Sequence, residues 1–363
     1  MTTGGRRGRR VLSWLLAIVL LGVVAWIVVP RLRPGGGTPA LTTVTGVIGS
    51  EKSAFFADQR VQDVFRANGL DVRVDPAGSR QIATTVDLGV YDFAFPSSAP
   101  AADKLLARHP AARIYAPFSS PMAVATFAPI KDVLTKAGIV TPSGTFDMHM
   151  FLELTAAGTR WDQLPGNTAY PARKNVLLST TEPCQSNSAL MYLGIASYAA
   201  NGDSVVPDAA GADKVLPTMS ALFRDQGYRP SSTEVLFEDY QSAGVGKVPM
   251  AVVYEQQFLG EALSADSTLP AGTVLLYPTP TVFSRHTLVP LKPAGDRVGE
   301  LLTTNPELVK LEAQFGFRTT DPRPFTEAVK AKGLPPPPDL IDVVEPPSYD
   351  TLESMLTKLG CKA

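Results

Sequence analysis

The chain has 363 residues, of which 45% are hydrophobic and 18% charged, and its formal net charge is -1. This length predicts two lobes, or one domain plus appendages, because single cores stop growing at about 250–300 residues. The first 40 residues hold six arginines and no acidic residue, so the other 27 basic and 34 acidic side chains give the body a net charge of -7. A mildly acidic body argues against nucleic-acid binding and against docking on anionic lipid.

An apolar run of nineteen residues, Val11–Val29, is long enough for a helix to cross the hydrocarbon core of a membrane. Four arginines precede this run and two follow it. The bias predicts that residues 1–10 are cytoplasmic, that 11–29 are a retained signal anchor and that the body is extracellular. A cleaved signal peptide is the alternative, although Thr38–Ala40 matches a cleavage site poorly. The Gly- and Pro-rich residues 30–40 are expected to be a flexible linker.

The next part of the chain repeats a strand, a small polar turn and a helix. Strands are predicted at 41–48, 70–74 and 91–95, and helices at 55–67 and 101–108. This order is typical of a parallel sheet covered by helices, in which ligands bind at the carboxyl ends of the strands. The polar turns Gly49–Lys52, Gly78–Arg80 and Pro96–Pro100 fall near those ends.

The run 113–128 is longer than an ordinary strand and contains two prolines, which predicts a strand that leaves one sheet and enters another. Further helices are predicted at 130–138, 145–157, 208–224, 258–263 and 298–315, and further strands at 175–178, 234–237, 248–254, 273–277 and 288–291. Pro335–Pro338 and Pro346–Pro347 predict an extended arm that carries a last helix at 348–359.

The segment Ser179–Ala189 lies between the apolar run Val176–Leu178 and an apolar helix predicted at 190–200. The first N–H groups of a helix lack backbone partners and carry the positive end of its dipole. Six of the eleven residues are Ser, Thr or Asn, whereas a cap needs only one. We therefore expect this loop to face a ligand, and an elaborate cap is the alternative.

The two cysteines, Cys184 and Cys361, lie in the part predicted to be extracellular, which favours one disulfide between them. The alternative is a buried thiol and an unrelated thiol on the tail. His109, His149 and His286 are scattered singly, so we expect no metal site and no cofactor. No histidine lies in a motif that would activate a serine, and Gly-x-Ser-x-Gly does not occur, so we do not expect an enzyme.

In their order along the chain, these motifs resemble those of the extracellular solute-binding proteins of bacterial transport systems, in the hinged two-lobed form of type 2. The motifs that carry the resemblance are Gly49–Lys52, Gly78–Arg80, Tyr91–Pro96, Ser186–Ser188 and Val252–Glu255. The likeness covers about residues 41–320. The chain also resembles the membrane-anchored members of this group that accompany von Willebrand factor A domain proteins.

The resemblance implies an α/β, periplasmic-binding-protein-like fold of two lobes, preceded here by one transmembrane helix. Lobe 1 would comprise residues 41–120 and 251–333, lobe 2 residues 121–250, and a Pro-rich arm with the last helix residues 334–363. The two hinge strands would be Arg113–Ala128 and Val248–Tyr254.

The function implied is capture of a small ligand by hinge closure, for transport or sensing, because a ligand held between both lobes stabilises their closed state. An oxyanion is favoured, with Ser and Thr hydroxyls and helix-start N–H groups as donors and with Arg80 or Lys52 supplying charge. The expected ligand-binding residues are Gly49, Ser50, Glu51, Lys52, Ser79, Arg80, Ser97, Ser98, Ser119, Thr181, Ser186, Asn187, Ser188 and Glu255.

Two alternatives stay open. Glu51, Asp92, Glu182 and Glu255 also lie near strand ends, and carboxylates in a dry cleft would suit a cationic or amine solute. The other alternative is an interaction domain that kept the two-lobed shape without a ligand. The expected partners are therefore a small-molecule or inorganic anion, the membrane, and a transporter permease or a von Willebrand factor A domain protein.

Overall fold

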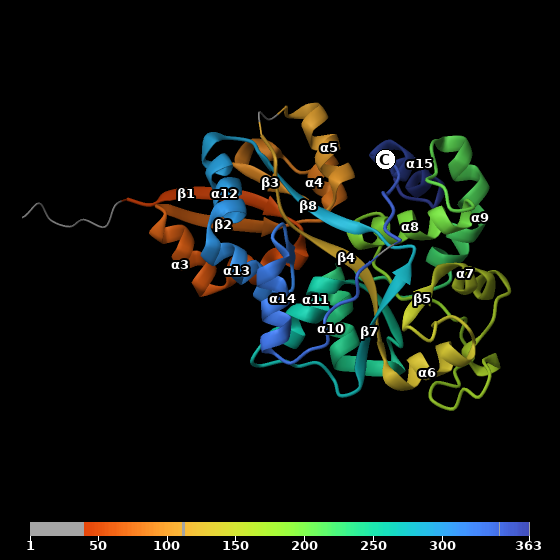
Figure 1. Ribbon diagram of the computed structural model, residues 1–363. Helices are drawn as coiled ribbons and strands as arrows, with labels where there is room; N and C mark the ends of the chain where they lie inside the picture. The colour runs from red at the N-terminus through yellow and green to blue at the C-terminus, as the bar shows by residue number, and fades with distance from the viewer. Residues whose placement is uncertain (1–39, 111–112, 341, 363) are drawn as a thin grey trace, which may run out of the picture. The chain divides into compact units, whose positions relative to one another are not determined.

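One long strand, β4 (Tyr115–Phe127), belongs to two groups of strands in the computed structural model, which describes residues 40–110, 113–340 and 342–362 (Figure 1). The first half of β4 pairs with β8 (Phe283–Pro290) and β9 (Arg318–Thr319). The second half pairs with β6 (Met250–Tyr254) and β7 (Thr273–Thr279). The strand that was predicted to leave one sheet for another does so.

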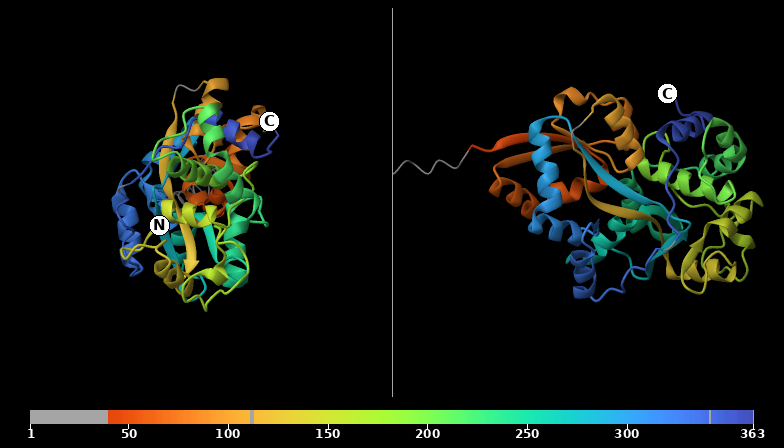
Figure 2. Two further views of the ribbon diagram at one scale, coloured as in Figure 1. Left: turned by 90° about the vertical axis from the view of Figure 1, so that its right-hand side faces the viewer. Right: turned by 45° about the horizontal axis from the view of Figure 1, so that its top comes forward.

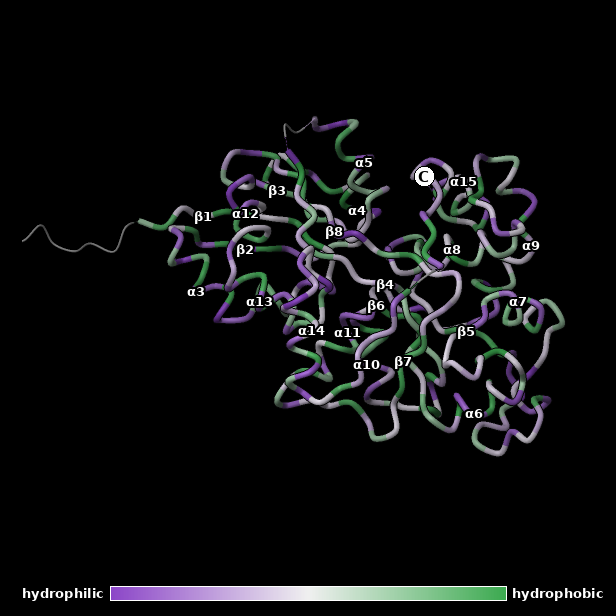
Figure 3. The backbone as a smooth tube through the Cα atoms, viewed as in Figure 1, coloured by the Kyte–Doolittle hydropathy of each residue, from purple (hydrophilic) through white to green (hydrophobic). Residues whose placement is uncertain are grey.

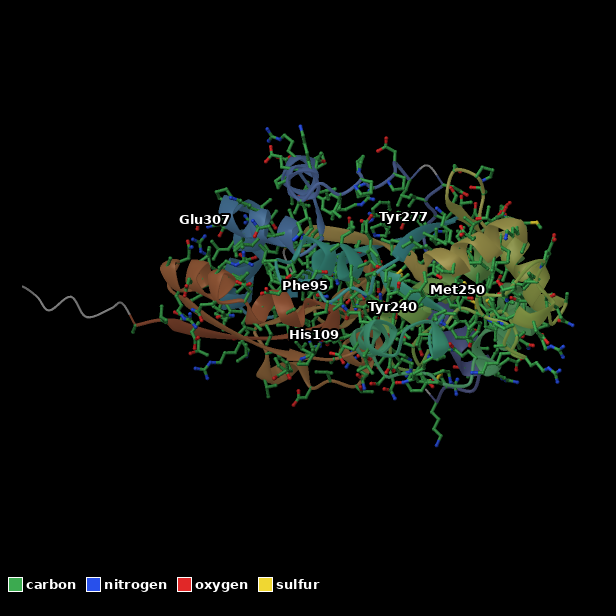
Figure 4. All side chains as sticks on the ribbon, turned by 90° about the horizontal axis from the view of Figure 1, so that it is seen from below. Phe95, His109, Tyr240, Met250, Tyr277 and Glu307 are labelled. Carbon is green, nitrogen blue, oxygen red and sulfur yellow. A yellow bond between two sulfur atoms is a disulfide. The ribbon has the colours of Figure 1, made fainter. Side chains whose placement is uncertain are left out.

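Lobe 1 is the half built on β1 (Thr42–Ile48), β2 (Leu70–Pro76), β3 (Phe93–Phe95), β8 and β9. β1 runs parallel to β3, and β8 runs antiparallel to β3. Its helical segments are η1 (Ser50–Lys52), α2 (Ser53–Ala57), α3 (Gln59–Ala67), α4 (Ser79–Thr84), η2 (Leu88–Val90), α5 (Ala99–Arg108), α12 (Pro293–Thr304) and α13 (Pro306–Gln314). Its core is rich in phenylalanine, and Phe95, labelled in Figure 4, is fully buried there.

Lobe 2 is built on the second half of β4, with β5 (Thr145–Asp147), β6 and β7. Its helical segments are α6 (Ala128–Lys136), α7 (Met148–Ala156), η3 (Trp161–Gln163), α8 (Asn187–Ala200), α9 (Ala209–Arg224), α10 (Thr233–Ala243) and η4 (Gly244–Gly246). Helix α8 is apolar on all sides, and twelve of its fourteen residues are buried. The tube of Figure 3 is correspondingly green, or hydrophobic, along much of β7 in this core.

Side-chain caps explain where several helices begin. Asp58, Asp147, Asp208, Asn305, Asp321 and Ser348 each accept a hydrogen bond from a first-turn N–H group of the following helix. The strand predicted at 234–237 is wrong for the same reason. Ser232 caps α10 there, and the buried Leu236, Phe237 and Tyr240 have helical spacing.

The second crossing strand also differs from the prediction. Val248–Tyr254 was expected to cross, but β6 pairs along its whole length with the second half of β4 and so lies in lobe 2. The chain returns to lobe 1 through β7 and then β8, which run antiparallel to β4 one after the other. The first half of β8 lacks a strand-like apolar pattern because it carries Ser284 and His286, whose buried polar atoms contact Ser97 and Lys52.

Helices α11 (Glu255–Leu263), α14 (Pro322–Ala331) and α15 (Tyr349–Lys358) lie where the lobes meet. α15 packs on α8 and α9 of lobe 2 and on α5 of lobe 1 (Figures 1 and 2). Its Tyr349 is buried against Ala83 and Ala101 of lobe 1. A disulfide with a Cα–Cα distance of 5.3 Å joins Cys361, just after α15, to Cys184 of lobe 2.

The predicted membrane span Val11–Val29 lies outside the described residues and stays a prediction. Among the residues that the structure describes, no helix is both long enough and apolar enough to cross a membrane.

We expect the double variant Cys184→Ser/Cys361→Ser to lower the free energy of unfolding by about 2–5 kcal/mol, because the bridge closes a long loop of the unfolded chain. Urea unfolding followed by circular dichroism measures this loss. Reductant should destabilise the natural protein and leave the double variant unchanged. Equal unfolding midpoints for the oxidised protein and the double variant would contradict the expectation.

Candidate functional site

A cavity of about 340 Å³ lies where the loop after β1 meets the starts of α4, α8 and α10. Ser50 and Ser97 come from lobe 1 and Ser186 from lobe 2, and all three line this one cavity. The predicted residues that line it are Gly49, Ser50, Glu51, Ser79, Ser97, Ser186 and Asn187. The structure thus brings half of the predicted set together, and ligand binding by these residues stays a prediction.

Other lining residues were not predicted from the sequence. They include Gln81, Gln185, Ser231, Ser232, Thr233, Glu234 and Tyr254. The signal that could have found α10 is the Ser-Ser-Thr-Glu sequence that opens it, which is typical of a helix start. The strand predicted at 234–237 is incompatible with a helix start at this point, so the signal was not used.

The start of α8 has no side-chain cap among the described residues, although Ser186 occupies the N-cap position. The Oγ atom of Ser186 lies 3.1 Å from that of Ser188. Ser188 Oγ is in turn 2.8 Å from Thr181 Oγ1 and accepts from Thr233 Oγ1 at 2.7 Å. Because these hydroxyls bond one another, none of them caps the first N–H groups of α8. Those N–H groups point toward the end of the helix that borders the cavity. Thr181 and Ser188 support the cavity from behind and do not line it.

Asn187 links the lobes across the cavity. Its Nδ2 donates to Tyr254 Oη at 2.9 Å and to the carbonyl oxygen of Ser97 at 3.4 Å. Its Oδ1 is buried and has no hydrogen-bond partner in the described structure. A buried acceptor without a donor costs free energy, and a donor placed beside it would recover that cost.

Lys52 was expected to contact the ligand, but it lies beneath the cavity and is fully buried. Its Nζ donates to Glu51 Oε1 at 2.5 Å and to Ser97 Oγ at 3.0 Å, and lies 3.1 Å from His286 Nδ1. The ammonium also lies 4.8 Å from the ring centre of Phe95. A buried ammonium must be paired, and these partners compensate its charge. Lys52 therefore neutralises the carboxylate of Glu51 from the side away from the cavity.

Burial shifts the pKa of each ionisable member of this cluster. Burial would raise the pKa of Glu51, but the Lys52 ammonium and the hydrogen bond with His286 hold that pKa well below its ordinary value. Burial lowers the pKa of Lys52, against the attraction of Glu51. Burial, with the positive charge of Lys52, lowers the pKa of His286 to about 4. At neutral pH the cluster therefore contains a carboxylate and a neutral imidazole.

Other predicted residues have structural partners outside the cavity. Arg80 Nε and Nη2 donate to Glu353 at 2.7 and 2.9 Å, so Arg80 ties α4 to α15. Glu255 is buried and accepts from Arg318 at 2.6 and 2.8 Å and from Tyr277 Oη at 2.6 Å. Arg80 and Glu255 were predicted to bind the ligand because their partners, Glu353 and Arg318, lie far away in the sequence and could not be foreseen from neighbouring residues.

The remaining two predicted serines, Ser98 and Ser119, lie outside the cavity lining, one at a helix start and one within a strand. Ser98 is the N-cap residue of α5, and Ser119 lies within β4, opposite Arg285 and Arg318. Asp92 and Glu182, named for the amine alternative, also lie outside the cavity lining. Asp92 Oδ2 accepts from the backbone N–H of Thr45 at 2.7 Å.

Among the described residues, the charged side chains that line the cavity are the carboxylates Glu51 and Glu234. Glu234 lies in the first turn of α10 and is half-buried. Burial raises its pKa, and the nearby charges of Glu238 and Glu51 raise it further. The cavity therefore combines helix starts, which favour anions, with carboxylates, which favour cations.

Gly78, the N-cap residue of α4, lets the lobes approach closely. A Cβ atom at this position would lie 2.1 Å from the carbonyl oxygen of Gln185, in the turn that opens α8. Its φ of -65° is allowed for any residue, so space and not backbone freedom requires glycine.

No family model matches the sequence, and a comparison with curated proteins finds no relative. Solved structures do share the fold of this chain. Iron-bound HitA from Pseudomonas aeruginosa has a TM-score of 0.56 at 12% identity, over 88% of this chain and 98% of that one. The sulfate-binding protein SubI from Mycobacterium tuberculosis has a TM-score of 0.51 at 18% identity, over 88% of this chain and 96% of that one.

The ferric ion-binding protein A of Pasteurella haemolytica has a TM-score of 0.53 at 12% identity, over 87% of this chain and 95% of that one. The chain has a periplasmic-binding-protein fold. At these identities the likeness shows the fold alone. In this fold the cavity lined by Ser50, Ser97 and Ser186 lies between the lobes.

We expect Gly78→Ala to hinder lobe closure, because the added methyl group would overlap the Gln185 carbonyl. The apparent affinity for a ligand that binds the closed state should fall about tenfold or more, since the competent fraction falls. Titration calorimetry and the radius of gyration in solution measure affinity and closure.

Gly246→Ala is the matched control, because a Cβ atom there meets no neighbour within 4 Å. Unchanged affinity and an unchanged radius of gyration in Gly78→Ala would show that closure does not need this contact.

The stability of the protein should fall as the pH drops from about 6.5 to about 4. In this window the unfolded chain protonates His286 near its ordinary pKa of 6.5, whereas in the folded protein the pKa of His286 is about 4. The unfolded state then binds more protons, which costs about 2–3 kcal/mol of stability by pH 4. The stability is fully present above about pH 6.5. Further loss below about pH 4.5 is expected from Glu51, whose folded pKa is depressed.

Urea unfolding at a series of pH values measures this dependence. His286→Gln should flatten the slope between pH 6.5 and 4, whereas His109→Gln, at an exposed position, should keep it. The same slope in both variants would rule out His286 as its source.

Proposed function

We propose that this chain is a membrane-anchored extracellular solute-binding protein that captures a small oxyanion between its lobes by hinge closure. The observation that carries the proposal is that the starts of α4, α8 and α10 meet at one hydroxyl-lined cavity. The start of α8 has no side-chain cap among the described residues, so its N–H groups are free to donate to an anionic oxygen.

The neighbouring structures support solute binding in general. The fold is shared with a protein named for sulfate and with proteins named for iron, so the fold does not select the charge of the ligand. Selection must come from the side chains and helix starts of this cavity. The predicted anchor at 11–29 would hold the body outside the cell, where it would deliver its ligand to a permease or signal occupancy to a von Willebrand factor A domain protein.

A second candidate is a cationic or amine solute. It is favoured by the carboxylates of Glu51 and Glu234 and by the lack of a lysine or arginine among the described residues that line the cavity. A buried carboxylate is stabilised by a cation or a hydrogen-bond donor, which an amine supplies.

A thermal-shift screen of the full chain in detergent separates these candidates. Sulfate, phosphate, molybdate, polyamines, amino acids and sugars are the probes. A ligand present at 100 times its dissociation constant should stabilise the folded protein by about 2.7 kcal/mol. The shift should shrink in Gly78→Ala if the ligand binds the closed lobes. Stabilisation by none of these probes would contradict solute capture and favour the ligand-free interaction domain.

A further inference from the structure

The cavity contains carboxylate and amide oxygens that accept hydrogen bonds. Glu51 Oε1 receives bonds from Lys52 and Ser97 and lies 3.3 Å from His286 Nδ1, whereas Glu51 Oε2 has no hydrogen-bond partner among the described residues. Asn187 is 4% exposed, and its Oδ1 also has none. The carboxylate of Glu234 lines the same space. A ligand that fits must bring hydrogen-bond donors to these oxygens.

The Asn187 amide is oriented by its neighbours. The Ser97 carbonyl can only accept, so the Asn187 nitrogen must face it, and the Asn187 oxygen is left as the unpartnered atom. Ser97 Oγ donates to Glu51 Oε1 at 2.5 Å, so Asn187 and Glu51 are held near each other by the same serine. The acceptors are thus fixed in place before a ligand arrives.

The helix starts in the same cavity have the opposite requirement. The first N–H groups of α8 need acceptors, because its N-cap hydroxyl bonds Ser188 instead. A fully ionised oxyanion would satisfy these donors and would leave the Glu51 and Asn187 oxygens unpaired beside a like charge. An amine alone would satisfy the acceptors and leave the helix start unpaired.

The cavity is also larger than a single tetrahedral ion requires. Its volume of about 340 Å³ lies at the lower end of the range, roughly 300–1,000 Å³, that is usual for pockets of organic ligands. A ligand with two charged groups and a short carbon skeleton can therefore be accommodated.

We propose that the ligand is a small zwitterion of the amino-acid class. Its carboxylate binds at the start of α8, and its ammonium donates to Glu51 Oε2, Asn187 Oδ1 and Glu234. This inference rests on the proposed capture of a solute and narrows the oxyanion to a carboxylate that is joined to an ammonium. Lys52 positions Glu51 in this arrangement, because it bonds Oε1 and leaves Oε2 to the ligand.

Titration calorimetry of the full chain in detergent tests the proposal. The probes are the twenty common amino acids, sulfate and phosphate, and then the deaminated and the decarboxylated analogue of the amino acid that binds best. We expect that amino acid to bind about 100-fold or more tightly than either analogue, because each analogue leaves one set of charged partners unpaired.

The outcomes separate this inference from the proposed function. Sulfate or phosphate binding more tightly than every amino acid would overturn the zwitterion and leave oxyanion capture standing. An analogue that matches its parent amino acid would also overturn the zwitterion. Binding of none of the probes would overturn both proposals.

A pair of variants on α10 tests the ammonium contact. Glu234→Gln should weaken binding of the amino acid about tenfold or more and should leave binding of its deaminated analogue unchanged. Glu238→Gln is the matched control, because Glu238 lies one turn further along α10, is exposed and does not line the cavity. Both positions are accessible enough to tolerate the change, and circular dichroism checks the fold. Equal affinities in the two variants would contradict the assignment of Glu234.

Discussion

The buried ammonium of Lys52 is the interaction on which the arrangement of the site depends. It joins Glu51, which follows β1, Ser97, which follows β3, and His286 in the middle of β8. These three segments are far apart in the sequence and adjacent in the sheet of lobe 1. Removing a charge from water is costly unless its partners are well placed, so the cluster tolerates little displacement of any of them. The loop that carries Glu51 is held in this way at the edge of the cavity.

Hydrogen bonds connect this cluster to lobe 2. The Ser97 carbonyl accepts from Asn187 at the start of α8, and the same Asn187 donates to Tyr254 at the end of β6. The C-terminal helix adds a second connection, because Arg80 of lobe 1 binds Glu353 of α15, and the disulfide ties the end of α15 to Cys184. The lobes are therefore joined on two sides of the cavity, by a polar contact within it and by a covalently tethered helix beside it.

Charge in this site is organised locally. The body has a net charge of -7, and the described lining contains carboxylates without a basic side chain, so long-range attraction of an anion is not available. Helix starts and hydroxyls are the hydrogen-bond donors beside the cavity, and Lys52 cancels the charge of Glu51 without lining the cavity. The same fold serves proteins named for sulfate and for iron, which is consistent with ligand choice residing in a few side chains.

The sequence by itself determined the features that depend on neighbouring residues. Repeats of strand, polar turn and helix placed Ser50, Ser79, Ser97 and Ser186 at strand ends and helix starts, and the parallel order of β1 and β3 brings such ends to one edge. The tertiary structure decided the rest. Lys52, Arg80 and Glu255 lie outside the cavity lining because they pair with His286, Glu353 and Arg318, respectively. Each partner is more than sixty residues away in the sequence. Glu234 lines the cavity because α10 begins there, and β8 lies beside the first half of β4 in lobe 1, where its buried Ser284 and His286 contact Ser97 and Lys52.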